Sequence, residues 1–176
     1  GSGGVGAYND SNITYGFYAN SENDHMEIIN CIVQTFTYGA YYVGYIRDCV
    51  ICSIEYACRR GYLVERTIAI AGYCCFYQVD KVVNSISVGG QYGFLYNDIT
   101  QNCTTLGSNT AFRTTSGDIV NDCHAQFGAY AFYGGSNTNA STNGVMSSSF
   151  ASSCRYTSRY GYMNGLAQDA CRNQWT

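Results

Sequence analysis

The sequence contains no proline and few charged residues, and each shortage limits what the chain can be. Lys, Arg, Asp and Glu make up 12% of the 176 residues, about half the usual share in globular domains. Proline and lysine are the residues that usually protect a sheet edge from pairing with another chain. Their scarcity favours a protein that pairs with copies of itself.

Positive charge and long apolar runs are also scarce. The net charge is −3, and the densest basic spot is the pair Arg59 and Arg60. Because binding to a phosphate backbone requires several clustered cations, we expect no nucleic acid partner. No apolar run reaches the ~20 uninterrupted residues that span a bilayer, so we expect no transmembrane segment.

No catalytic signature stands out in the chain. The two histidines are His25 and His124, and His124 directly follows Cys123; neighbouring residues of a helix point apart, which argues against a Cys–His pair. Neither a G-x-S-x-G nucleophile motif nor a Walker loop occurs. Carboxylates are present, but their spacing singles out no pair for glycoside hydrolysis. We therefore expect a protein that is not an enzyme and has no catalytic residues, metal or cofactor.

Cysteine is abundant, and its number is even. Ten cysteines in a chain of this length predict a disulfide framework, and hence an extracellular protein, secreted or on the cell surface. The C-x-x-C at Cys49 and Cys52 lies in an expected helix, and Cys74 adjoins Cys75, so zinc and redox sites are less favoured than disulfides. The connectivity stays open, and a bridge between chains is possible. The residues expected in disulfides are Cys31, Cys49, Cys52, Cys58, Cys74, Cys75, Cys103, Cys123, Cys154 and Cys171.

Four N-x-S/T sequons are candidate glycosylation sites. Asn9 and Asn12 lie in residues 1–12, which we expect to form an N-terminal arm, and Asn139 lies in a polar stretch. Asn102 directly precedes Cys103 and is a poorer candidate.

A weak repeat runs through the sequence. A Tyr-Gly pair precedes a cysteine at one fixed spacing in residues 38–49, 92–103 and 160–171. Residues 98–103 and 118–123 also share their pattern, each beginning Asp-Ile and ending in cysteine. Coincidence in a chain rich in Tyr and Gly is the alternative explanation.

Helix caps and apolar spacing predict an α+β fold. Asp98 and Asp118 suit helix N-caps, and we expect helices at 21–36, 45–60, 98–106 and 118–127, with short ones near 146–154 and 166–170. Aromatic and β-branched residues predict strands at 15–18, 35–43, 62–77, 92–96 and 129–133. The prediction is a single disulfide-rich domain spanning 1–176, with short Cys-bearing helices packed on aromatic-rich antiparallel strands and a weak division at 89–90.

Tyrosine is the candidate interface residue, because it combines a large apolar ring with a polar tip. The chain has 18 tyrosines and one tryptophan. The expected interface residues are Tyr15, Tyr38, Tyr92, Tyr160 and Trp175.

These features predict a non-enzymatic, glycosylated extracellular structural protein that associates with itself into a filament, coat or matrix. Low charge, abundant Tyr and Gly and the absence of a catalytic set favour it. The alternatives are a small secreted effector, such as a toxin or pheromone, and a module that binds glycans through its tyrosines.

Overall fold

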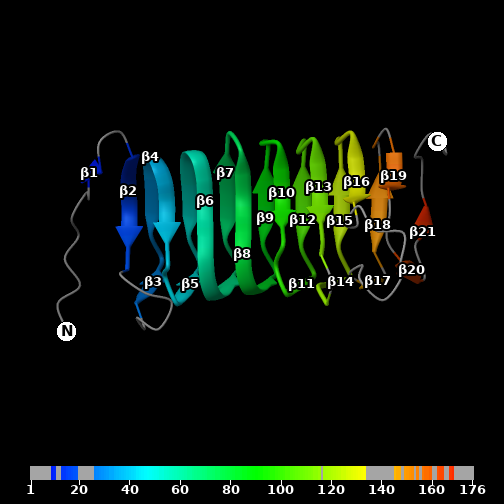
Figure 1. Ribbon diagram of the computed structural model, residues 1–176, viewed down its shortest axis with the longest axis horizontal. Coiled ribbons are helices and arrows are strands. Elements are labelled where there is room, and N and C mark those ends of the chain that lie inside the picture. The colour runs from blue at the N-terminus through cyan, green and yellow to red at the C-terminus, as the bar shows by residue number, and fades with distance from the viewer. Residues whose placement is uncertain are drawn as a thin grey trace.

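The chain winds as a parallel β-solenoid of about six turns (Figure 1). The computed structural model describes residues 9–10, 13–19, 26–115, 117–133, 145–147, 149–152, 154, 156–159, 162–164 and 167–168. These residues form 21 β-strands and no helix. The prediction of an α+β fold with antiparallel strands is therefore wrong. Only the two-residue β1 (Asn9–Asp10) pairs antiparallel, with β2, among the strand pairs described.

Each turn of the solenoid, or coil, contributes one strand segment to each of three faces. Face 1 consists of β2 (Ile13–Tyr18), the last part of β4 (Ile32–Tyr41), the middle of β6 (Val50–Glu65), the first part of β8 (Cys74–Val83), β10 (Tyr92–Leu95), β13 (Thr110–Arg113), β16 (Tyr130–Tyr133) and β19 (Tyr156–Arg159). Face 2 consists of β3 (Glu27–Ile29), β5 (Tyr45–Arg47), the ends of β6 and β8, β11 (Ile99–Gln101), β14 (Ile119–Asn121), β17 (Val145–Ser147) and β20 (Tyr162–Asn164). Face 3 consists of the starts of β4 and β6, β7 (Ile68–Ala71), β9 (Ile86–Val88), β12 (Thr104–Leu106), β15 (His124–Gln126), β18 (Phe150–Ser152) and β21 (Ala167–Gln168).

The coils stack in register, which places equivalent residues of successive coils in columns along the solenoid axis. On face 2, Glu27, Tyr45, Leu63, Lys81 and Ile99 follow one another at intervals of 18 residues. Later coils are longer, since Ile99 pairs with Ile119 and Ile119 with Val145. The sequence repeat found above is one manifestation of this 18-residue coil.

The interior is filled by columns of similar side chains. The rings of Phe76, Phe94, Phe112 and Phe132 stack with centroids 4.7, 4.9 and 5.3 Å apart. Face 2 contributes a buried aliphatic column, and face 3 a column of small and aliphatic residues that includes Ala69, Ser87 and Thr105. Stacked aromatic pairs add about 0.5–1.5 kcal/mol each beyond the burial of their area, so the phenylalanine column is a main source of stability.

The corner between faces 2 and 3 repeats in six successive coils of the described chain. The first residue of the corner has a left-handed backbone conformation, with φ between 47° and 55°. The residues at this position are Asn30, Asp48, Arg66, Asn84, Asn102 and Asp122. The next residue is Cys, Thr or Ser, and its side chain donates to the carbonyl two residues earlier, as Cys103 does to Gln101 at 3.2 Å and Ser85 does to Val83 at 2.8 Å. Cysteine, serine and threonine therefore form the same side-chain-to-backbone hydrogen bond at this corner.

The expected helices are strands because the inward positions of a coil are unevenly spaced. In the segment 98–106, Ile99 and Leu106 lie on outer surfaces and are partly exposed, whereas Cys103 points into the core and is 1% exposed. The i, i+4, i+7 pattern of these three residues imitates a helical face but spans two strands and a corner. The other expected helices that fall within the described residues, at 45–60 and 118–127, are strands and corners for the same reason.

The prediction of a disulfide-rich fold is also wrong. All nine cysteines in the described part of the chain are free thiols, and Cys171 lies outside it. Seven of the nine are buried, where they serve as small packing residues. No helix long and apolar enough to cross a membrane occurs among the described residues.

Candidate functional site

The outer surface of face 1 carries two columns of tyrosine and arginine. We call this surface the tyrosine–arginine face, and its residues are Tyr15, Tyr38, Tyr56, Tyr92 and Tyr130 in one column and Tyr18, Tyr41, Arg59, Tyr77, Arg113 and Tyr133 in the other. Cys74, Thr110 and Leu95 fill the remaining places between them and are buried. No Asp or Glu occupies a described position in either column, and Glu55, which precedes Tyr56, accepts a hydrogen bond from the hydroxyl of Tyr38.

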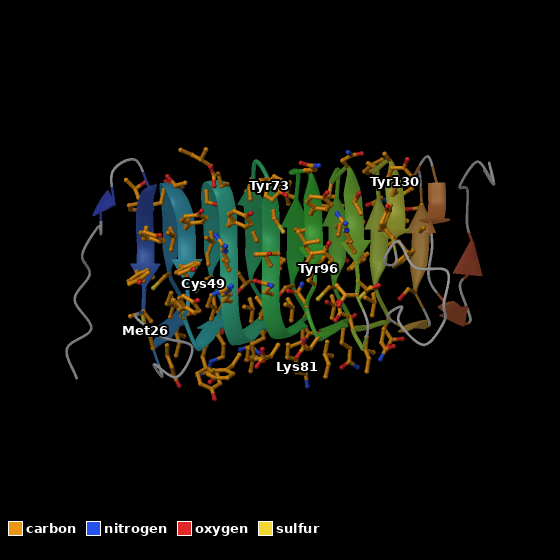
Figure 2. The ribbon with its side chains drawn as sticks, in the orientation of Figure 1. Met26, Cys49, Tyr73, Lys81, Tyr96 and Tyr130 are labelled. Atoms are coloured by element: carbon orange, nitrogen blue, oxygen red, sulfur yellow. The ribbon has the colours of Figure 1, made fainter. Side chains whose placement is uncertain are left out.

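The tyrosine rings pack on one another from coil to coil. Tyr15 stacks on Tyr38 at 5.2 Å between centroids, and Tyr38 lies 5.3 Å from Tyr56. Tyr73 links Tyr56 and Tyr92 of the same column, on either side of Cys74, with ring centroids 5.2 Å from Tyr56 and 5.5 Å from Tyr92. Figure 2 shows the side chains of the described residues, with Tyr73 and Tyr130 near the top of the view and Tyr96 lower. Because much of each ring face is covered by a neighbour, the surface offers mainly ring edges and hydroxyls.

Arg59 lies at the centre of four tyrosine rings. Its guanidinium carbon is 4.9–5.4 Å from the ring centroids of Tyr38, Tyr41, Tyr56 and Tyr77. An Nη1–H of Arg59 donates to the hydroxyl of Tyr38 at 3.3 Å. Cation–π contacts of this kind contribute about 0.5–1 kcal/mol at exposed sites, and together they hold the charge in one place.

Arg113 repeats this arrangement three coils away. Its guanidinium carbon is 5.2–5.5 Å from the ring centroids of Tyr92, Tyr96 and Tyr133, and it donates to the Tyr92 hydroxyl at 3.0 Å. Neither Arg59 nor Arg113 is in an ion pair with any of the described residues. Each therefore presents a fixed positive charge without an ion pair, although the Tyr38 hydroxyl beside Arg59 also donates to the carboxylate of Glu55.

The phenols of Tyr38, Tyr41 and Tyr56 stay neutral at neutral pH. Burial raises the pKa of Tyr41 and of Tyr56 to about 12, with the positive charge of Arg59 acting in the opposite direction. Burial also raises the pKa of Tyr38. The hydroxyls can therefore both donate and accept hydrogen bonds at neutral pH.

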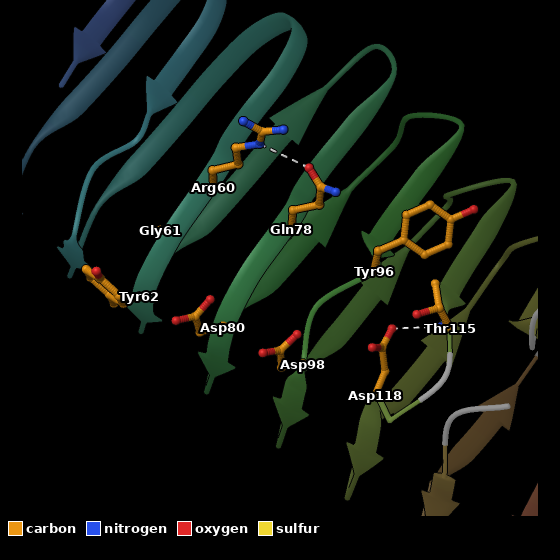
Figure 3. A pocket seen from close by; sticks show the side chains of 9 residues that line it. All are labelled: Arg60, Gly61, Tyr62, Gln78, Asp80, Tyr96, Asp98, Thr115 and Asp118. Atoms are coloured by element: carbon orange, nitrogen blue, oxygen red, sulfur yellow. Dashed lines mark hydrogen bonds between the residues drawn. The ribbon is translucent and has the colours of Figure 1, made fainter. Parts of the chain in front are cut away.

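A pocket of about 490 Å³ opens at the corner between faces 1 and 2, below the tyrosine–arginine face. Asp80, Asp98 and Asp118 line it from successive coils, facing Arg60 and Tyr96 across it (Figure 3). Burial is the main cause that raises the pKa of Asp118, and the charge of Asp98 adds to it. The backbone N–H of Thr115 donates to Asp118 at 2.7 Å and opposes this shift.

This row of carboxylates does not form a metal site. No group of three or more His, Cys, Asp or Glu in the described chain is arranged to hold a metal ion. Asp80 and Asp98 are exposed, where carboxylates are well hydrated.

The outer surface of face 3 is apolar. We call it the apolar face, and its residues are Ile32, Val50, Ile68, Ile86, Thr104 and His124 in one column and Cys52, Ile70, Val88, Leu106 and Gln126 in the other. Ile32 is 73% exposed, and Ile68 and Ile70 are 39% and 40% exposed. None of these residues is Asp, Glu, Lys or Arg, and partial burial lowers the pKa of His124, which keeps it neutral.

Three of the predicted interface tyrosines lie together. Tyr15, Tyr38 and Tyr92 share one column of face 1. Tyr160 and Trp175 lie outside the described residues. Arg59 and Arg113 were missed as site residues, although their separation of 54 residues, three times the coil length of 18, was a signal in the sequence.

The predicted cysteine and asparagine sites fall in different surroundings. Burial raises the pKa of the Cys49, Cys58 and Cys74 thiols and raises that of Cys75 to about 12, so these are unreactive groups. Asn102 is exposed at a corner, where its amide donates to Asn84 at 2.6 Å. Asn9 lies in β1, and Asn12 and Asn139 lie outside the described residues.

Comparisons with protein-family models, with curated proteins and with solved structures find no match to this chain.

Proposed function

We propose that this protein is a non-enzymatic structural subunit that associates with copies of itself through the apolar face. The observation that carries the proposal is a flat, partly exposed sheet surface with no Lys, Arg, Asp or Glu at its eleven positions. Soluble monomers rarely expose a contiguous apolar surface beyond a few hundred Å². Such a surface on a β-sheet is a candidate for face-to-face packing with another sheet.

A second copy of this chain is the partner that best fits the apolar face. The outward side chains repeat once per coil, at the 4.7–4.9 Å spacing of neighbouring strands. A second solenoid has the same period, so its side chains can lie between those of the first along the whole face. Interdigitation of identical columns is the packing that makes sheet–sheet interfaces dry and close.

The size of the face predicts a reversible association. Six coils at ~4.8 Å and a width of about four residues at ~3.3 Å give roughly 400 Å² per copy. A stable dimer buries about 800 Å² per partner. The apolar face alone is therefore expected to give a dimer that forms at high concentration, and a filament or matrix needs a further contact.

The extracellular location and the glycosylation no longer have the support that the cysteines gave them. Seven of the nine described thiols are buried, and those at the corner between faces 2 and 3, such as Cys49 and Cys103, form the same hydrogen bond as Ser85 and Thr67. The proposal of self-association is independent of where the protein resides.

Sedimentation velocity over a range of concentrations tests the proposal. The I68K/I70K variant places two lysines on the apolar face, and V83K/I99K places two on the outer surface of face 2 as a matched control. We expect the wild type and the control to associate as concentration rises and I68K/I70K to remain a monomer. A wild type that stays monomeric at millimolar concentration, or equal loss of association in both variants, contradicts the proposal.

A further inference from the structure

We infer that the tyrosine–arginine face binds an acidic polysaccharide, a chain of sugars that carries carboxylate groups. This is a second surface, on a different face of the solenoid from the apolar face. The inference rests on the two arginines, on the absence of ion pairs to them among the described residues and on the state of the tyrosine rings.

The first step concerns charge. Arg59 and Arg113 are each enclosed by tyrosine rings and have no ion-pair partner in the described part of the chain. Each guanidinium has five N–H donors, and one hydrogen bond is found for each, to Tyr38 and to Tyr92. Donors therefore remain for an incoming anion, and a carboxylate matches the planar fork of a guanidinium.

The second step concerns geometry. Arg59 and Arg113 occupy the same column three coils apart, which is about 14 Å along the axis at ~4.8 Å per coil. The ligand must therefore be extended and must carry more than one negative charge. Since in-register coils fix both arginines, the site is formed before the ligand arrives, and little conformational entropy is lost on binding.

The third step separates a polysaccharide from a single-stranded nucleic acid. Nucleic acid binding of this kind depends on bases that stack on open aromatic faces. Here neighbouring side chains cover the aromatic ring faces: the ring of Tyr15 stacks on that of Tyr38, and tyrosine rings surround the guanidinium of Arg59. The accessible groups are then mainly neutral tyrosine hydroxyls, which can form hydrogen bonds with the hydroxyl groups of a sugar chain.

Isothermal titration of the protein with polygalacturonate tests the inference. The R59Q/R113Q variant removes both charges, and K81Q/R66Q removes two charges from face 2 and its corner as a matched control. Circular dichroism verifies that both variants fold. The titrations are made at a low micromolar concentration at which sedimentation velocity finds a monomer, so that self-association does not contribute to the measured binding.

We expect the wild type and K81Q/R66Q to bind alike and R59Q/R113Q to bind at least tenfold more weakly. R59K, which keeps the charge but loses the planar fork, is expected to lie between them. Added salt should weaken binding of the wild type. Unmodified dextran should not bind, and dextran sulfate should bind more weakly than polygalacturonate.

Four outcomes overturn the inference: no binding of polygalacturonate, equal binding of neutral dextran, tighter binding of oligo-dT, or equal loss in the two double variants. Tighter binding of dextran sulfate assigns the face to sulfated chains and overturns the carboxylate specificity.

Discussion

The ring of Phe94 lies 4.7 Å from that of Phe76, and the two planes are 13° apart. Both side chains are almost completely buried, and they occupy equivalent places on successive coils. The stack continues through Phe112 and Phe132 at nearly the same spacing. This column ties four coils together and helps to set the coil-to-coil spacing of the outer side chains on which both proposed surfaces depend.

Replacing Phe94 by alanine is expected to destabilise the protein strongly. The change removes two ring contacts and leaves a cavity between rigid coils, for which a cost of about 3–5 kcal/mol is typical. Phe127→Ala is the control, because Phe127 is 62% exposed and its loss should change the free energy of unfolding little. Urea denaturation measures both, and similar costs for the two variants would show that the column is not a main source of stability.

Gly39 is expected to tolerate no side chain. A Cβ at this position would lie 2.2 Å from Cγ2 of Ile51 and 2.7 Å from the carbonyl oxygen of Ala57, so Gly39→Ala should cost about 1–3 kcal/mol or more. Gly107 has φ of +77° and open space around it, so Gly107→Ala should cost only about 1 kcal/mol. Comparing the thermal midpoints of the two variants separates the effect of crowding at Gly39 from that of backbone strain at Gly107. A larger decrease in midpoint for Gly107→Ala than for Gly39→Ala would contradict the prediction.

The Tyr-Gly repeat reflects equivalent positions of stacked coils, whereas the sequence analysis predicted an α+β fold from the same chain. Tyr38 and Tyr92 lie in one outer column of face 1. Gly39 and Gly93 are the positions where a side chain would enter the core. Cys49 and Cys103 follow at the corner between faces 2 and 3. The period, the glycine positions and the shared column of Tyr38 and Tyr92 were thus available from the sequence.

Strands of face 1 could be predicted from local pattern, since those expected at 15–18, 92–96 and 129–133 fall on β2, β10 and β16, whereas the short strands of faces 2 and 3 could not. A coil has strands of three or four residues and corners at which Asn102 or Asp122 takes a left-handed conformation. Inward positions then recur at irregular intervals, and Asp98 and Asp118 resemble helix caps. The arginines of face 1 become neighbours of tyrosines only when coils stack, so their role depends on contacts between residues about 18 positions apart.

The thiols of the folded protein are expected to react in two classes. Cys31 and Cys52 are partly exposed, whereas the other seven described cysteines are buried, and Cys171→Ser removes the tenth. In that variant, Ellman's reagent should modify two thiols rapidly under native conditions and all nine after unfolding. Adding Cys52→Ser should reduce the rapid class to one. If only one of the nine sulfurs reacts in the unfolded, unreduced protein, the other eight are instead oxidised in pairs.

Asp118→Asn is expected to stabilise the protein at neutral pH. Burial and the nearby charge of Asp98 raise the pKa of Asp118 above its ordinary value of 3.8, so the folded state favours the protonated carboxyl. The stability that this group contributes is fully present below pH ~4 and is lost as pH rises through the pKa of the folded state. An asparagine oxygen can still accept the hydrogen bond that Thr115 donates.

The free energy of unfolding of Asp118→Asn should therefore exceed that of the wild type at pH 7, and the difference should disappear near pH 3. Asp80→Asn is the control, since Asp80 lines the same pocket but is exposed, and it should show little pH-dependent difference. Urea denaturation of the three proteins from pH 3 to pH 7 provides the measurement. A variant less stable than the wild type at pH 7 would mean that the ionised Asp118 is satisfied in the folded state, and that the pocket tolerates three negative charges.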